Sequence, residues 1–115
     1  MEDPALEAFG KLLMTRVRDE SIEQWDGLIA GQLKGSTAAR VKELLAGWSD
    51  EQRAVLNALV PAIVDTTLHH LLWTIEQEQT VSLSMSEGPQ LRDVSDGLAG
   101  DLIGWKKRYS KQRDF

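Results

Sequence analysis

The two histidines of this 115-residue chain, His69 and His70, are the first residues to consider for chemistry. Imidazole is a general acid, a general base and a metal ligand near neutral pH. Asp65 precedes His69 by four residues, so on a helix the two side chains lie one turn apart and could bind the same metal ion. Glu76 lies about 10 Å further along the helix axis, too far to join both on one ion. A metal site on Asp65 and His69 therefore needs ligands from another segment.

Recognisable catalytic motifs are absent from the sequence. The chain has no cysteine, which excludes thiolate zinc sites, iron–sulfur clusters and cysteine nucleophiles. It also has no Gly-x-Ser-x-Gly, no His-Glu-x-x-His and no phosphate-binding glycine motif. We therefore predict no cofactor and expect a protein that is not an enzyme. A small metal-binding or catalytic helical bundle that uses Asp65 and His69 is retained as an alternative function.

Charge is divided unevenly along the chain. The formal net charge is −5, but residues 106–115 hold five Lys/Arg and one Asp, which leaves eight Lys/Arg and 17 Asp/Glu for residues 1–105. An acidic body repels phosphate backbones, so nucleic-acid binding is not predicted. We interpret Lys106, Lys107 and Arg108 as complements to the acidic body or to the negative end of a final helix. The acidic N-terminus and the lack of a membrane-length apolar stretch predict a cytoplasmic protein without a membrane segment.

The longest predicted element is a helix over residues 49–79, and it must position both histidines. Ser49 and Gln52 match a capping box, which sets its start. Pro61 removes a backbone hydrogen bond inside the helix and predicts a kink or a short break there. Helical spacing places the apolar residues of the two halves on faces about a quarter-turn apart, and the first face comprises Leu56, Leu59, Val60 and Ile63. A bend would let both faces meet one core.

Three shorter helices are predicted before the long one. Asp3 caps a helix that ends near Arg18, Ser21 caps a second one, and a third closes around Gly47. Beyond the long helix, Val81, Leu83 and Met85 alternate with serines, and a turn follows. We predict a β-hairpin over residues 80–96, then a Gly-rich loop or short helix with a basic tail over 97–115. The expected fold is a single mainly α domain: a compact bundle of about four helices over residues 1–79, with a small hairpin.

The four tryptophans are expected mostly in the core, with Trp73 as the exception. On the helical wheel Trp73 lies away from the apolar stripe, beside Thr66, His70 and Gln77. Because exposed tryptophan is typical of binding surfaces, these four residues form the predicted interface. We predict a protein-interaction domain, either a homodimer or an adaptor that binds a protein partner. An immunity-type or antitoxin-type inhibitor of a basic effector is an alternative, since acidic charge would steer that association.

Overall fold

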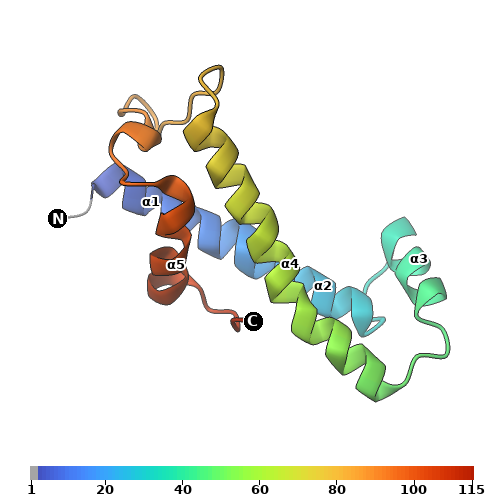
Figure 1. The fold of residues 1–115 in the computed structure, drawn as a ribbon. Helices are drawn as coiled ribbons and strands as arrows, with labels where there is room; N and C mark the ends of the chain where they lie inside the picture. Colours follow the sequence, from blue (N-terminus) through green and yellow to red (C-terminus); the bar gives the residue numbers. More distant parts are fainter. Residues whose placement is uncertain (1–2) are drawn as a thin grey trace.

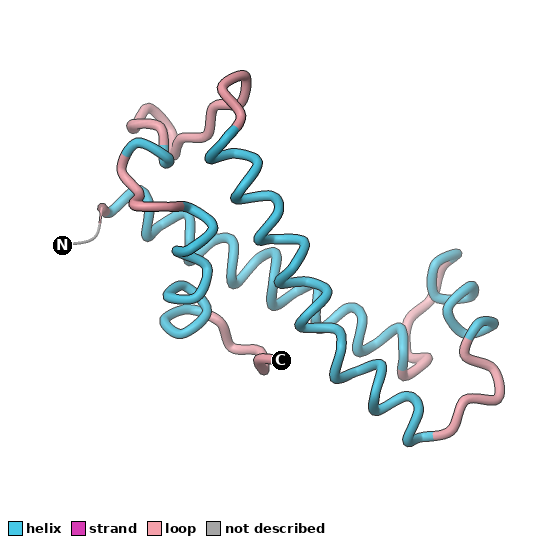
Figure 2. The backbone as a smooth tube through the Cα atoms, in the orientation of Figure 1, coloured by secondary structure: helices cyan, strands magenta, loops and turns pink. Residues whose placement is uncertain are grey.

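The computed structural model describes residues 3–115, and it confirms a mainly helical fold (Figures 1 and 2). In chain order the elements are α1 (Pro4–Leu12), the π-helical η1 (Leu13–Arg18), α2 (Asp19–Ile29), α3 (Ser36–Leu44), α4 (Asp50–Gln77), the 3-10 turn η2 (Leu91–Asp93) and α5 (Leu98–Tyr109). A rod made of α1, η1 and α2 lies beside α4 (Figure 1).

The first helix does not end near Arg18, so that prediction is wrong. Leu13 and Asp19, at the two junctions, keep right-handed helical dihedral angles, and the rod continues to Ile29. The predicted cap at Asp3 is confirmed, because its carboxylate accepts from the amides of Ala5 and Leu6. No Gly or Pro lies between Lys11 and Ser21, so nothing interrupts the helix there. The rod ends where Gly31 adopts a left-handed φ of 72°.

The long helix is one unbroken element from Asp50 to Gln77. Its predicted start is confirmed, because Ser49 and Gln52 make both bonds of the capping box. The predicted break at Pro61 is absent. Proline lacks the N–H that would bond the Asn57 carbonyl, and Arg113 Nη2 donates to that oxygen instead at 2.6 Å. The C-terminal segment thus satisfies the acceptor that the proline leaves free.

The predicted β-hairpin is wrong. Residues 3–115 contain no strand, and an isolated bridge between Ser84 and Gln90 is the only β-type pairing among them. The turn after Met85 does form, since Gly88 N–H donates to the Met85 carbonyl at 2.9 Å. A second strand is missing because the chain turns into η2 at Leu91, whose side chain is buried. The next segment, predicted as a loop or short helix, forms α5.

Two hydrophobic clusters share α4. The larger joins α1, η1, α5 and the C-terminal half of α4, and the smaller joins α2, the segment after α3 and the N-terminal half of α4. Trp105 is fully buried and lies against Gly10, where an added Cβ would collide with the indole. The molecule measures 50 × 27 × 21 Å, and its radius of gyration of 16.7 Å exceeds the about 13 Å of a spherical domain of this length. An elongated shape leaves much of α4 uncovered.

Candidate interaction surface on helix α4

One face of α4 is exposed along most of the helix. The predicted interface residues Thr66, His70, Trp73 and Gln77 all lie on it and are exposed. Helical spacing places further residues on the same face. We call this face the outer stripe; its members are Val55, Leu59, Ala62, Ile63, Thr66, His70, Trp73 and Gln77.

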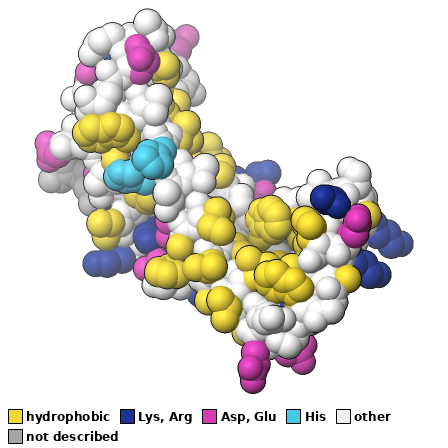
Figure 3. Space-filling model, turned by 45° about the vertical axis from the view of Figure 1, so that its right-hand side comes forward, with side chains coloured by type: hydrophobic (Ala, Val, Ile, Leu, Met, Phe, Trp, Pro, Cys, Tyr) yellow, Lys and Arg dark blue, Asp and Glu magenta, His cyan; other side chains and the backbone are white. Residues whose placement is uncertain are grey.

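The outer stripe is mostly apolar, since five of its eight residues are apolar, and it contains no Asp, Glu, Lys or Arg. Val55, Leu59, Ile63 and Trp73 are 64%, 42%, 58% and 50% exposed. From residue 54 to residue 75 the only Asp, Glu, Lys or Arg is Asp65, which lies on the inward face. Figure 3 shows a large group of hydrophobic side chains on this side of the molecule and a smaller patch beside the two histidines. A helix face that meets only water normally carries charged and polar residues instead.

The stripe corrects two expectations about the core. Leu59 and Ile63 were assigned to an inward apolar face, but both are exposed. Of the four tryptophans, Trp105 alone is fully buried, and the other three are 41–50% exposed. In the N-terminal half of α4 only Val60 and Pro61 are buried. The core therefore covers only some of the apolar side chains in this half, and the others stay exposed.

A shallow apolar hollow of about 240 Å³ borders the outer stripe between α2 and α4. Trp25 and Ile63 stand at its rim, and its other lining residues are Ile29, Leu56, Val60 and Val64. Typical pockets for drug-sized ligands measure about 300–1,000 Å³. The hollow therefore suits one or two protein side chains better than a cofactor.

Asp65 and His69, the predicted metal ligands, lie in different surroundings on α4. Asp65 accepts from Arg18 Nε at 2.7 Å and from Lys106 Nζ at 3.1 Å. His69 is exposed, and its ring packs edge-on against that of His70 at 5.7 Å. Within residues 3–115 no group of three or more His, Cys, Asp or Glu side chains is placed to hold a metal. The two cations beside Asp65 would also oppose a metal ion there.

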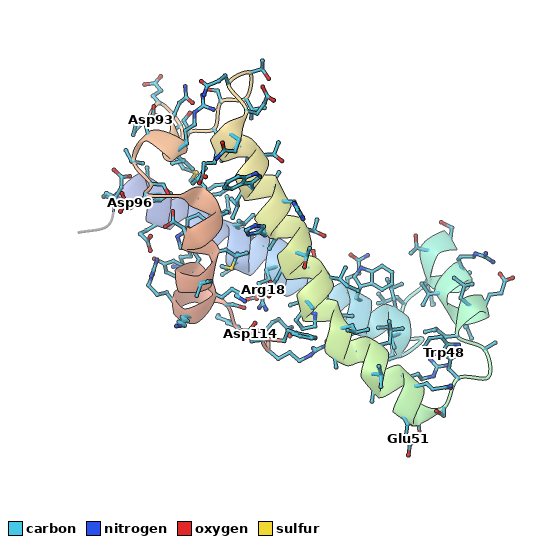
Figure 4. The ribbon with its side chains drawn as sticks, in the orientation of Figure 1. Arg18, Trp48, Glu51, Asp93, Asp96 and Asp114 are labelled. Atoms are coloured by element: carbon cyan, nitrogen blue, oxygen red, sulfur yellow. The ribbon has the colours of Figure 1, made fainter. Side chains whose placement is uncertain are left out.

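Arg18 is the centre of a polar network that the sequence analysis missed. Its side chain is 1% exposed. Besides Asp65, it donates to Ser110 Oγ at 2.7 Å and to the Arg113 carbonyl at 3.1 Å. Figure 4 shows Arg18 and Asp114 near each other, and their charged groups are 3.7 Å apart. The network fastens the C-terminal segment onto η1 and α4.

The electrostatic interpretation of the basic C-terminal residues is confirmed for Lys106 and for Arg108, which pairs with Glu7. Lys106 contacts both Asp65 and Asp114. Burial alone would lower the pKa of Lys106, but its hydrogen bonds to Asp114 and Asp65 raise that pKa above its ordinary value. Arg113 pairs with Asp26 at 2.7 Å. Lys106 and Arg113 thus place positive charge of the tail beside Asp65 and Asp26 of the body.

A second ion-pair group joins α5 to α1. Glu7 accepts from Trp105 Nε1 at 3.2 Å and from the Tyr109 hydroxyl at 2.7 Å, and its carboxylate pairs with Arg108 at 2.7 Å. Burial would raise the pKa of Glu7, but the hydrogen bonds from Tyr109, Arg108 and Trp105 together lower it. Both polar groups lie on inward surfaces, away from the outer stripe.

Comparison of the chain with protein-family models, with curated proteins and with solved structures gives no match. The fold and surface therefore define only a class of protein, a mainly helical chain with an uncovered apolar helix face. Of the helices within residues 3–115, α4 is the one whose length and composition would also fit a membrane span, and 22% of its most apolar window is buried.

Proposed function

We propose that this chain is a protein-interaction domain that binds another polypeptide through the outer stripe of α4. The observation that carries the proposal is the absence of Asp, Glu, Lys and Arg from an exposed stripe on a chain that is 27% charged. Apolar side chains scattered singly on a surface are ordinary, but several large ones on one uncharged helix face are typical of a binding surface.

The size of the stripe supports this function. The exposed parts of its four large apolar residues amount to about 400 Å², each being 42–64% exposed. At about 25 cal/mol per Å², covering that area contributes on the order of 10 kcal/mol before the costs of association are subtracted. That gain is of the magnitude a protein–protein complex requires.

The architecture also limits the entropy cost of binding. The stripe residues stand on one continuous helix, which is capped at its start and packed against the rod and α5. Binding therefore orders side chains but no backbone segment, and a preformed surface loses less entropy than a flexible one. Trp73 is the expected energetic centre, because buried tryptophan contributes strongly at interfaces.

The proposal is tested with two charge substitutions in the full chain used as immobilised bait. Ile63→Glu places a charge in the outer stripe, and Ile103→Glu places the same charge on α5; the two isoleucines are 58% and 61% exposed. We expect the immobilised wild type and the immobilised Ile103→Glu variant to bind the same partner protein, which is either a second copy of this chain or a different protein. Ile63→Glu should reduce its retention by about tenfold or more, because an unpaired carboxylate would be desolvated in the interface.

Retention that is equal for the wild type and Ile63→Glu would overturn the proposal, and so would the absence of any specific partner. Circular dichroism of both variants establishes that the fold is retained, which is expected because each substitution lies at an exposed helical position.

A further inference from the structure

We infer that the outer stripe is covered by a second copy of this chain, with the two α4 helices packed antiparallel about Thr66. This inference rests on the proposed function and identifies the partner. All the positions concerned lie on one face of α4, where Ala62 is half-buried and the others are exposed.

The spacing of the stripe is symmetric about Thr66. Along its central row the residue numbers are 55, 59, 62, 66, 70, 73 and 77, so the gaps are four, three, four, four, three and four. This series reads the same in both directions. When two copies run antiparallel with Thr66 on a twofold axis, every residue of the row faces another residue of the row. Such a self-complementary surface is what a twofold homodimer requires.

The sizes of the facing residues are compatible with close packing. At the axis Thr66 meets Thr66 of the second copy, and its hydroxyl already donates to the Ala62 carbonyl at 2.8 Å. One turn away the small Ala62 faces the larger His70. Trp73 then lies over Leu59, and Gln77 faces Val55 at each end. Small residues at the centre permit close approach of the helix backbones, and the tryptophan covers the apolar side chain opposite.

The area of the stripe is close to what a stable dimer needs. Its central row from Val55 to Gln77 extends about 33 Å along the helix. With the polar residues added to the four large apolar ones, the stripe offers on the order of 700 Å² per copy, against about 800 Å² per partner in a standard interface. Trp25, which is 42% exposed at the rim of the hollow, adds to the contact.

Charge favours the same partner. Two copies of an acidic chain, of net charge −5, would repel if carboxylates met in the interface. The stripe brings no carboxylate to the axis, because Asp65 is held on the inward face by Arg18 and Lys106. A basic partner would find no countercharge on the stripe. The uncharged face of a second copy matches it.

A bilayer is the competing occupant, and the inward face of α4 disfavours it. A span would surround α4 with lipid, so Asp65 would have to leave Arg18, and Asn57 would lose the donor that Arg113 provides. Uncompensated polar groups in hydrocarbon are costly. Packing against a second copy leaves all of these contacts in place.

Cysteine cross-linking tests the arrangement, since the chain has no cysteine of its own. Thr66→Cys places thiols at the axis. Thr67→Cys is the matched control, because Thr67 is also exposed and makes the same type of bond, to the Ile63 carbonyl at 2.9 Å, but lies about 100° further around the helix. Under mild oxidation by glutathione we expect Thr66→Cys to form a disulfide-linked dimer about tenfold faster than Thr67→Cys.

The direction of the helices is tested by mixing two single variants. An antiparallel dimer brings Ala62→Cys of one copy next to His70→Cys of the other, so the mixed disulfide should exceed either self-linked product. A parallel dimer would instead link each variant to itself, because equal positions would then face each other. That second outcome would overturn the inferred arrangement.

Light scattering of the wild type at increasing concentration separates this inference from the proposed function. We expect a dimer that Ile63→Glu converts to a monomer and Ile103→Glu does not. A wild type that stays monomeric and lacks the Thr66-specific disulfide would overturn the second copy as the partner. The proposed function would survive that result if another protein were still captured in an Ile63-dependent manner. Flotation of a monomeric wild type with phosphatidylcholine vesicles, lost in Ile63→Glu, would overturn both.

Discussion

The inward and outward faces of α4 differ in where they carry polar groups and in whether those groups have partners. On the inward face Asp65 has two cationic partners and the Asn57 carbonyl has a guanidinium donor. On the outward face the side chains are largely apolar, and no segment within residues 3–115 covers them. A helix face that met only water would carry charged and polar side chains instead. A surface that is exposed in the single chain therefore need not be adapted to water.

The largest effect is expected from breaking the inward face at Arg18. Arg18→Ala leaves Asp65 without its closest partner in a nearly buried site, which should lower the free energy of unfolding by about 3–5 kcal/mol. Arg16→Ala is the matched control, because its pair with Glu20 is 69% and 57% exposed and should contribute less than about 0.5 kcal/mol. Urea denaturation measures both changes. Equal effects would show that the inward network does not stabilise the fold.

A smaller effect is expected at the proline of the inward face. Arg113→Ala removes the donor to the Asn57 carbonyl and the partner of Asp26, which should cost about 1–3 kcal/mol. Pro61→Ala restores an N–H that can bond Asn57 within the helix. The cost of Arg113→Ala should therefore be smaller in the Pro61→Ala background. A double-mutant cycle in urea checks this, and strict additivity would contradict the compensation.

Local signals in the sequence predicted the helix starts at which a side chain caps the backbone. Asp3 and Ser49 cap their helices as expected, since each bond joins residues two or three positions apart. Ser21 and Gln24 match the same pattern but lie inside a helix. A capping sequence defines a start only where the chain before it cannot be helical, and no breaker precedes Ser21. The alternation after Gln79 predicted a hairpin because two inward residues, Leu83 and Met85, suffice to produce that pattern.

The Arg18 network could not be predicted from periodicity. Arg18 and Asp65 are separated by 47 residues, and the Ser110 contact spans 92. A single arginine in a charged run resembles solvent-exposed charge, and only the packing of η1 shows that it is buried. The outer stripe was predicted in part: the position of Trp73 on the wheel identified its C-terminal half. Leu59 and Ile63 were missed because an apolar helical face is normally assigned to the core.

A pH-dependent effect is expected where Lys106 contacts the inward face. The pKa of Lys106 is raised above its ordinary 10.5, so its contribution is complete below that pH and is lost as the pH rises through the raised pKa. The free energy of unfolding, measured by urea denaturation, should fall between about pH 9 and 12. Lys106→Met should reduce this fall by less than about 1 kcal/mol. The pKa of Tyr109 is also raised, chiefly by its hydrogen bond to Glu7, so Tyr109 contributes to the same loss of stability at high pH. Tyr109→Phe measures that contribution separately. A slope unchanged by Lys106→Met would contradict the assignment.

The smallest effect on the isolated chain is expected on the outward face, and its dependence on concentration separates the two faces most sharply. At high dilution, Ile63→Glu should change the free energy of unfolding by no more than about 0.5 kcal/mol, because the side chain is 58% exposed. If a partner copy covers the stripe, association stabilises the folded state by mass action, and the wild-type urea midpoint rises with protein concentration.

The urea midpoint of Ile63→Glu should stay constant as the concentration rises, whereas that of Arg16→Ala should rise like that of the wild type. Arg16 pairs with Glu20 on the same rod, so a rise in its variant and none in Ile63→Glu assigns the concentration dependence to the stripe. A wild-type midpoint that did not vary with concentration would mean that the apolar face of α4 is not covered by a second copy.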